Sequence, residues 1–281
     1  MATQSIYKSQ AGGEEILAFY NQILNRWPLP SKHVNIPTSY GNTFVIESGN
    51  PSGDPVVLLH GTASNSASWM GDVATYGKQF HVYAVDMPGE PGNSDSARFS
   101  WAGPAFHLWL DEVLNGLALE KVILIGMSLG AWTAVDYALY QPDRIKQTVL
   151  IVPSGISQPR ASFVFRFIFF SLTGAWGRRR LKQFIFNGAE LGEEVSRFLD
   201  LVDQHFYYRT GAPPLFTDIQ LQSLAMPVLF LAGRQDALLN TSKTAERLKK
   251  CVPDLTMKIY EADGHATINT SGYVVDFINK K

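Results

Sequence analysis

The stretch VILIGMSLGAWTAV, residues 122–135, holds one serine between two glycines inside a run that is otherwise apolar. Glycine inside a strand or helix costs about 0.5–1 kcal/mol relative to alanine, and serine favours turns and helix starts over element interiors. Packing alone would not keep these residues there. The stretch therefore predicts a buried strand that ends near Gly126, a sharp turn at Ser128 and a helix that begins at Leu129.

Short runs rich in Val, Ile and Leu alternate with helical patterns along the chain. The predicted strands are TFVIES, PVVLLH, HVYAVD, KVILIG, QTVLIV, PVLFLAG and LTMKIY. Most of them are apolar on both faces, which is typical of a parallel sheet covered by helices on both sides. Predicted helices span about 14–26, 104–119, 129–140 and 272–280. The alternation predicts an α/β layered fold.

The alternation stops between residues 153 and 216, which contain no convincing strand and are rich in Phe, Leu and Arg. A length of 281 residues suits one large domain or one domain that carries an insertion. We therefore expect a discontinuous α/β core of residues 1–152 and 217–281. Residues 153–216 are expected to form a mainly helical lid between two of its strands.

Composition and charge exclude several classes of protein. Apolar residues make up 46% of the chain and charged residues 17%, so it can bury a sizeable core. The net charge of −1 argues against a nucleic-acid partner, since binding one requires many cationic contacts to phosphates. The single cysteine, Cys251, allows no intrachain disulfide and no cysteine-based metal site. The first residues lack the apolar stretch of a secretory signal, so we expect a cytoplasmic protein.

The most apolar part of the expected lid is FVFRFIFFSLTGAW, residues 163–176. It is shorter than the roughly 20 apolar residues that a membrane-spanning helix needs, so we expect no integral membrane segment. Its aromatic side chains either pack the lid onto the core or bind an acyl or aryl group. Arg178, Arg179, Arg180 and Lys182 follow, either as a solvated helix face or as a surface for an anion or a membrane.

The pattern Gly-x-Ser-x-Gly between a strand and a helix is typical of a nucleophile elbow. Its tight turn needs small residues two positions before and after the serine. The turn projects the hydroxyl of Ser128 above the C-terminal edge of the sheet. The helix that follows directs backbone N–H groups to the same place, where negative charge is stabilised.

A serine hydroxyl needs a general base, which is usually histidine. His265 lies in the loop EADGHATI after the last predicted strand. Sites of open α/β sheets gather in loops at the carboxyl ends of strands, so we assign His265 as the base. His60 is expected to shape its own loop. The other histidines are His33, His81, His107 and His205.

The imidazole in turn needs a carboxylate that holds its tautomer and stabilises the imidazolium. Asp236 follows the strand PVLFLAG and gives the chain order Ser, Asp, His that is expected for this elbow. Asp263 is too close to the histidine in sequence to reach its far ring nitrogen easily. Asp254 is expected at the opposite edge of the sheet, and Asp86 is expected to bond loop amides.

Two backbone N–H groups are expected to stabilise the oxyanion. One belongs to Leu129, which follows the nucleophile. The other lies in the loop after PVVLLH, where we favour Thr62 and keep Ala63 as the alternative. Gly61 would allow that backbone to approach closely.

The motifs HGTASNSASW, VDMPGEPGNS, GMSLG, GRQD and DGH, in this order, resemble the α/β-hydrolase family over residues 30–281. The segments YNQILNRWPLP and GEPGNS resemble bacterial carboxylesterase-like members. The resemblance implies an eight-stranded, mostly parallel sheet with a lid between the sixth and seventh strands. It also implies a triad of Ser128, Asp236 and His265 and no cofactor. Many lidded relatives have Glu-x-Pro after the histidine, where this chain has HATINTSGYVV.

We therefore expect a serine hydrolase that cleaves carboxylic esters of small molecules with a hydrophobic acyl or aromatic part, without a metal. One alternative is other triad chemistry: amide or peptide cleavage, C–C bond hydrolysis or perhydrolysis. Another is a ligand-sensing protein that retains a hydrolase core. A serine nucleophile argues against dehalogenases and epoxide hydrolases, which use a carboxylate. The sequence indicates neither the acyl preference nor the oligomeric state.

Overall fold

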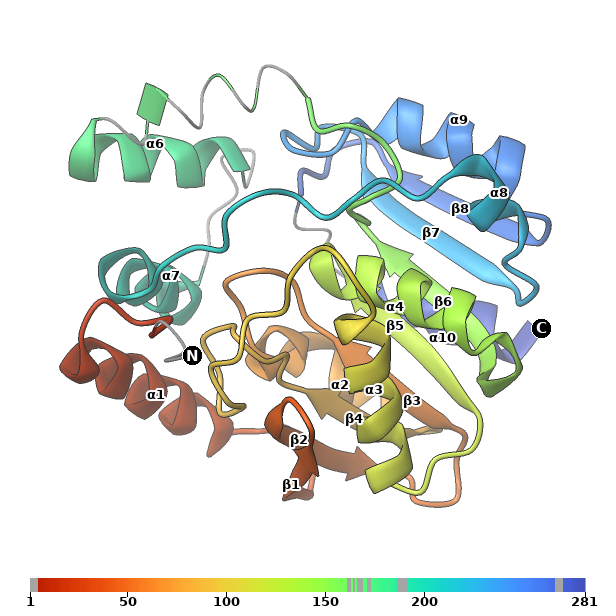
Figure 1. Cartoon of the computed structure of the whole chain (residues 1–281), viewed down its shortest axis with the longest axis horizontal. Helices are drawn as coiled ribbons and strands as arrows, with labels where there is room; N and C mark the ends of the chain where they lie inside the picture. Colours follow the sequence, from red (N-terminus) through yellow and green to blue (C-terminus); the bar gives the residue numbers. More distant parts are fainter. Residues whose placement is uncertain are drawn as a thin grey trace.

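A central sheet of eight strands organises the molecule (Figure 1). The computed structural model describes residues 5–160, 163, 165, 169–170, 173–185, 192–265 and 270–280. The strands are β1 (Ser31–Thr38), β2 (Gly41–Gly49), β3 (Pro55–Leu59), β4 (His81–Val85), β5 (Val122–Met127), β6 (Ile145–Ile151), β7 (Val228–Gly233) and β8 (Leu255–Tyr260). Their spatial order is β1-β2-β4-β3-β5-β6-β7-β8.

Strand direction confirms the predicted α/β fold with a mostly parallel sheet. β2 pairs antiparallel with both β1 and β4, whereas all pairs among β3 to β8 are parallel. The carboxyl ends of β3, β5, β6, β7 and β8 therefore meet at one edge of the sheet. The loops that leave this edge carry the candidate catalytic residues.

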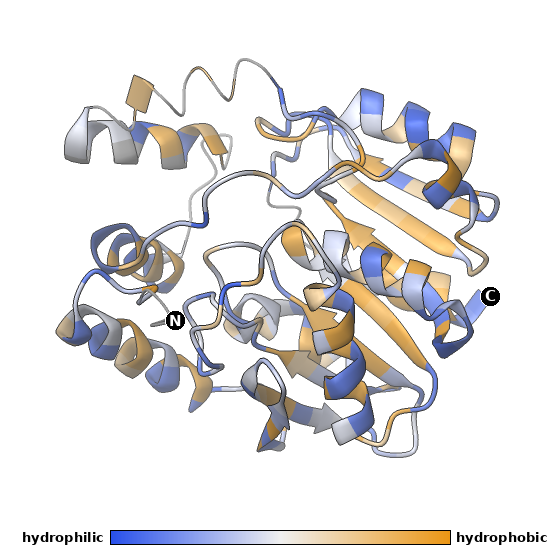
Figure 2. Ribbon diagram, in the orientation of Figure 1, coloured by the Kyte–Doolittle hydropathy of each residue, from blue (hydrophilic) through white to orange (hydrophobic). Residues whose placement is uncertain are grey.

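The central strands are buried on both faces, as their composition predicts. The side chains of Val56 to Leu59 in β3 and of Val122 to Ile125 in β5 have no exposed surface. Figure 2 shows these strands as a continuous hydrophobic layer between helices with polar outer faces. Each fully buried Val, Leu or Ile stabilises the fold by about 1.5–3 kcal/mol, so the central strands hold the edge of the sheet rigidly.

Helices cover both faces of the sheet. α3 (Ala105–Gly116) and α4 (Leu129–Tyr140) pack together on one face, and α2 (Met70–Tyr76) and α10 (Ser271–Lys280) pack together on the other. α9 (Thr241–Cys251) contacts β7 and β8, and α8 (Asp218–Gln222) contacts α9. Short 3₁₀ turns span Ser66–Trp69 and Pro142–Arg144. α4 has the predicted bounds, whereas α2, α8 and α9 were not predicted from the sequence.

The N-terminal helix α1 (Gln10–Leu24) begins four residues before the predicted position 14. Ser9 explains the earlier start, because its side chain accepts a hydrogen bond from the backbone N–H of Gly12 and so caps the helix. α1 packs against α7 (Glu193–His205), which lies between β6 and β7. The N-terminal helix therefore packs against the segment that the sequence predicts to be the lid.

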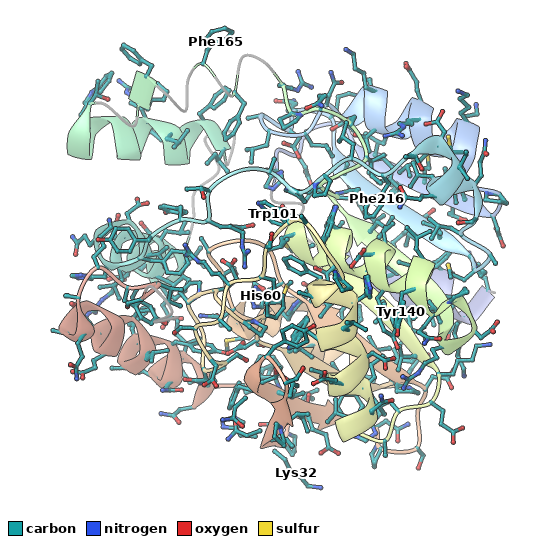
Figure 3. All side chains as sticks on the ribbon, viewed as in Figure 1. Lys32, His60, Trp101, Tyr140, Phe165 and Phe216 are labelled. Carbon is teal, nitrogen blue, oxygen red and sulfur yellow. The ribbon has the colours of Figure 1, made fainter. Side chains whose placement is uncertain are left out.

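The described part of residues 153–216 includes α6 (Gly174–Ile185) and α7. Phe165, Phe169 and Trp176 are 74%, 58% and 54% exposed, so these rings do not pack the segment onto the core. Phe165 points away from the body of the molecule in Figure 3. Phe167 and Ile168, also in the aromatic run, lie outside the described residues. None of the helices in the described ranges is long and apolar enough to cross a membrane.

Candidate active site

The turn at Ser128 has the geometry that its flanking glycines predict. β5 ends at Met127, Ser128 adopts φ 52° and ψ −106°, and α4 begins at Leu129. A positive φ is strained for a residue other than glycine, and such strain persists only where the surrounding structure holds it. The N–H of Ser128 donates to the carbonyl of Ile151 at 2.9 Å, and its carbonyl accepts from Trp132 at 3.1 Å. β6 and α4 therefore hold the turn from both sides.

The two glycines of the motif are required by close backbone approach. A Cβ on Gly126 would overlap the backbone of Gly130, and a Cβ on Gly130 would overlap the carbonyl oxygen of Leu59. Both obstacles are main-chain atoms, which cannot move aside without shifting α4 or the buried strand β3.

Replacing Gly130 by alanine should therefore destabilise the protein by about 1–3 kcal/mol, which is the usual cost of overpacking a core. Urea unfolding followed by circular dichroism measures this change. Gly71→Ala in α2 is the matched control, because a Cβ at that residue would meet nothing within 4 Å, and it should leave stability unchanged or raise it slightly. Equal stability of Gly130→Ala and wild type would contradict this account of the turn.

The hydroxyl of Ser128 is half-buried and pairs with a second serine. Its Oγ lies 3.4 Å from the Oγ of Ser154, and the N–H of Ser154 donates to the carbonyl of Ser128 at 3.3 Å. Within the described part of the chain, Ser128 has no hydrogen bond to His265. Ser154 was not predicted as a site residue. Its position directly after β6, at the same edge of the sheet, is the signal that could have indicated it.

His265 and Asp236 are brought together from two different loops. Nδ1 of His265 lies 2.7 Å from Oδ2 of Asp236. The other carboxylate oxygen, Oδ1, accepts from the N–H groups of Leu238 and Leu239, each at 2.8 Å. Asp236 is 1% exposed, and its hydrogen bonds compensate its buried charge. This carboxylate can hold His265 with its proton on Nδ1, which leaves Nε2 as the acceptor.

The alternative residues have other partners in the structure. Oδ1 of Asp86 accepts from the N–H and hydroxyl of Ser66 and from the hydroxyl of Tyr20, and Oδ2 accepts from the N–H of Asn93. Asp86 thus bonds loop amides, as expected. The histidines of the chain other than His60 and His265 contact Glu47 (His81), Asp136 (His107), Glu15 (His205) and the ring of Phe44 (His33). In the ranges that the structure describes, no His, Cys, Asp or Glu side chains cluster as metal ligands would.

The loop after β3 lies beside Ser128. A Cβ built on Gly61 would be only 3.5 Å from the Cβ of Ser128. The N–H of Thr62 has no partner among the described residues, whereas the N–H of Ala63 donates to Oε2 of Glu90 at 2.6 Å. Of the two residues considered for the second oxyanion donor, Thr62 is the one whose N–H is available.

His60 anchors this loop in its neutral form. Its Nε2 accepts from the N–H of Met87 at 2.8 Å, so Nδ1 carries the proton and donates to the carbonyl of Gly61 at 2.8 Å. Burial lowers the pKa of His60 below its ordinary value, because the charged imidazolium would lose its hydration. This arrangement agrees with the expectation that His60 shapes its loop.

The lowered pKa of His60 predicts a pH-dependent stability. The unfolded chain takes up this proton near pH 6.5, before the folded protein does, so folding is favoured above pH 6.5 and weakened as the pH falls below it. We expect the Tm of the wild type to fall more between pH 7.5 and 5 than that of His60→Gln, which has no proton to gain. Parallel Tm profiles would show that His60 does not contribute.

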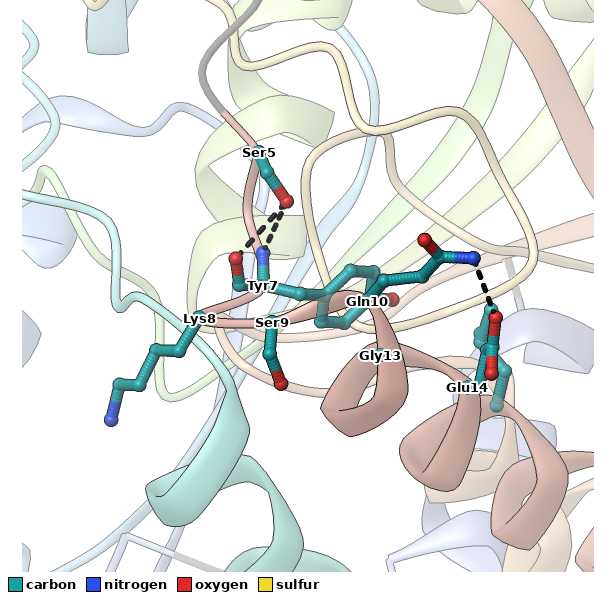
Figure 4. Close-up of a pocket in the computed structure, with 8 residues that line it drawn as sticks. Ser5, Tyr7, Lys8, Ser9, Gln10, Gly13 and Glu14 are labelled. Atoms are coloured by element: carbon teal, nitrogen blue, oxygen red, sulfur yellow. Dashed lines mark hydrogen bonds between the residues drawn. The ribbon is translucent and has the colours of Figure 1, made fainter.

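A shallow hollow of about 480 Å³ lies at the start of α1. Its lining comes from the N-terminal segment and α1: Ser5, Tyr7, Lys8, Ser9, Gln10, Gly13, Glu14 and Leu17. Figure 4 shows that some polar groups of this lining are already hydrogen-bonded to each other, Ser5 with Tyr7 and Gln10 with Glu14. No candidate catalytic residue lines it, so it is not the candidate active site.

Residues 56–272 match the model of the alpha/beta hydrolase family, and the chain belongs to this family. The resemblance predicted from the motifs is thus confirmed. The chain is similar to carboxylesterase YbfK of Bacillus subtilis, with 29% identity over 254 residues that cover 88% of this chain and 86% of the relative. It is 26% identical to the uncharacterized carboxylesterase nap of the same organism, covering 94% of this chain and 90% of nap. The crystal structure of carboxylesterase CesB (YbfK) superimposes with a TM-score of 0.86 at 27% identity, covering 96% of this chain and 99% of that one.

Proposed function

We propose that the protein is a serine hydrolase that cleaves carboxylic esters with a hydrophobic acyl or aromatic part. The observation that carries the proposal is the contact of His265 with the buried carboxylate of Asp236, at the same edge of the sheet as the strained turn of Ser128. Similarity to two bacterial carboxylesterases over most of the chain supports the ester as the bond that is cleaved.

Aromatic residues near the nucleophile support a hydrophobic substrate. Trp132 lies one helical turn after Ser128 in α4, and its ring stacks on Phe216 with centroids 5.6 Å apart. The ring of Trp101 meets the ring of Trp132 edge-on, with ring centroids 5.8 Å apart. Phe216 itself belongs to the segment between β6 and β7, so this aromatic cluster joins that segment to α4. Apolar walls with few polar groups are typical of small-molecule sites.

In the proposed mechanism, Oγ of Ser128 exchanges its contact with Ser154 for one with Nε2 of His265. His265 takes the hydroxyl proton while Oγ forms a bond to the ester carbonyl carbon. The carbonyl oxygen becomes an oxyanion that accepts hydrogen bonds from the N–H groups of Leu129 and Thr62. Asp236 stabilises the imidazolium through Nδ1.

The intermediate then collapses, and the C–O bond to the leaving alcohol breaks. Nε2 of His265 gives its proton to the departing oxygen, which leaves an acyl-enzyme on Ser128. A water molecule, deprotonated by the same nitrogen, attacks the acyl carbon. The bond to Oγ breaks, Oγ regains a proton, and the carboxylic acid leaves.

A fluorophosphonate probe tests the proposal, because it phosphonylates activated serines. We expect the folded protein to be labelled at Ser128, as located by peptide mapping, and the heat-denatured protein to remain unlabelled. A series of p-nitrophenyl esters from acetate to laurate then measures acyl preference. Absence of both labelling and ester turnover, with a rise in Tm on binding a small ligand, would favour the ligand-sensing alternative instead.

A further inference from the structure

Glu90, in the loop after β4, is a buried carboxylate that the proposed mechanism does not use. It is 1% exposed. Burial raises the pKa of its carboxyl, and this rise is opposed by Arg209 and by the N–H of Ala63. Oε2 accepts from that N–H at 2.6 Å, and Oε1 lies 3.4 Å from Nε of Arg209. An unpaired charge in this position would be costly, so these partners define where the carboxylate lies.

Arg209 comes from the segment of residues 206–216 that returns from α7 to the core. Its side chain is 6% exposed. Nη1 donates to the carbonyl of Phe99 at 2.7 Å, and the guanidinium lies 5.0 Å from the ring centre of Trp101. Arg209 therefore contacts both the loop of Glu90 and the aromatic cluster near the nucleophile.

The loop that carries Glu90 also donates hydrogen bonds to the return segment, whereas Arg209 donates from the return segment to that loop. Arg98 donates to the carbonyl of Tyr207 and lies 5.0 Å from the ring centre of Phe206. Nε1 of Trp101 donates to the carbonyl of Thr210 at 3.1 Å. The loop after β4 and the return segment are more than a hundred positions apart in sequence. Each donates hydrogen bonds to carbonyls of the other, and these bonds hold the two together.

Ala63, whose N–H donates to Glu90, connects the pair of Glu90 and Arg209 to the loop after β3. Its backbone has a φ of 56°, a conformation that costs free energy for a residue with a Cβ. Its methyl group belongs to a small buried cluster with Ile6, Ile16, Leu201, Val202 and Phe206, from the N-terminal segment, α1, α7 and the return segment. The preceding residue, Thr62, carries the N–H that we assign to the oxyanion. A shift of Ala63 would therefore move Thr62 relative to Ser128.

We propose that Glu90 is a positioning residue for the oxyanion donor Thr62, and that its pairing with Arg209 makes this position depend on the return segment of the lid. The inference rests on the proposed function. It identifies a residue that acts on turnover through Ala63, without touching the substrate.

Kinetics of Glu90→Gln test the first half of the proposal. The amide keeps the shape of the side chain but removes the charge that strengthens the bond to Ala63 and pairs with Arg209. Loss of an oxyanion donor costs about a hundredfold to a thousandfold in turnover, and a small displacement of one should reduce kcat by about ten- to a hundredfold. KM should change by less than about threefold, because the ground-state carbonyl depends little on this donor. Glu47→Gln is the control. The side chain of Glu47 contacts His81 near the start of β4, and this variant should keep the wild-type kcat.

Amide hydrogen exchange at Ala63, followed by NMR, provides a readout that does not depend on turnover. We expect this amide to exchange at least about tenfold faster in Glu90→Gln, since its acceptor is weakened. If that variant does not fold, Arg209→Lys tests the same link, because lysine keeps the charge but lacks the planar, multiply donating guanidinium. Its kcat should fall more than about twofold below the wild-type value, but less than that of Arg209→Met, and Ala63 should exchange faster.

The proposal is supported if kcat falls and Ala63 exchanges faster in the same folded variant. It is overturned if either quantity stays within about twofold of the wild-type value in a folded Glu90→Gln or Arg209→Lys protein. Ester turnover that survives removal of the Ser128 hydroxyl would instead contradict the proposed function, and the exchange rate would then still decide whether Glu90 holds Ala63.

Discussion

Ser128→Ala should lose ester turnover by about a millionfold, down to the level that binding and oxyanion donors alone can provide. The neighbouring hydroxyl of Ser154 should not replace it, because Ser154 lies on a different loop, outside the strained turn. The fold should survive, since alanine removes a single half-buried oxygen and the N–H and carbonyl bonds of the turn remain. Stopped assays with a p-nitrophenyl ester at high enzyme concentration measure the residual rate.

Ser223→Ala is the matched control for this variant. Ser223 follows α8, and its hydroxyl donates a hydrogen bond to the carbonyl of Gln220, away from the candidate catalytic residues in sequence. Its turnover should equal that of the wild type. Ester cleavage by Ser128→Ala at a tenth of the wild-type rate or more would refute the nucleophile assignment.

Asp236→Asn should reduce kcat by about ten-thousandfold while leaving the structure nearly unchanged. The asparagine oxygen can still accept from the N–H groups of Leu238 and Leu239, so its NH₂ group turns toward His265. A donor in that position holds the imidazole with its proton on Nε2, the tautomer that cannot accept a proton from Ser128. Single-turnover kinetics with an activated ester measure the loss.

Asp263→Asn separates the two candidate carboxylates. The backbone carbonyl of Asp263 accepts from the N–H of Gln235, and this bond needs no charged side chain. We expect this variant to retain most of its activity. The reverse pattern, with Asp263→Asn inactive and Asp236→Asn active, would transfer the supporting role to Asp263.

Local sequence patterns predicted the elements on which the site is built. β5, the turn and α4 follow one another without interruption, so their apolar run and glycines report the structure directly. β1 was not predicted because only Ile36 of its eight residues is buried, and no alternation of apolar residues marks it. α9 was missed for a similar reason, since its buried face consists of Thr241, Thr244, Leu248 and Cys251, of which only two are strongly apolar.

Contacts between distant segments set the limit of prediction at the site. Asp236 and His265 could be proposed because each follows a strand that ends at the same edge of the sheet. Nothing in the sequence near Glu90 or Arg209 indicates that they meet, since they are 119 positions apart and the return segment has no strand or helix of its own between α7 and α8. Ser154 is a different case: the pairing of β5 with β6 brings it to Ser128, and its position after β6 is a sequence signal that could have indicated it.

The pairing of the N-terminal segment with the end of α7 has a consequence for biosynthesis. Backbone bonds join Lys8 to His205 and Tyr207 to Ile6, and Nζ of Lys8 reaches the carbonyl of Asp203, 195 positions further on. At roughly 5–20 residues per second on the ribosome, about 10 to 40 seconds pass between the translation of Lys8 and that of its partner segment. During that time Ile6 and Ile16 have no cluster to enter, and they are exposed to the surroundings as apolar side chains that a chaperone can bind.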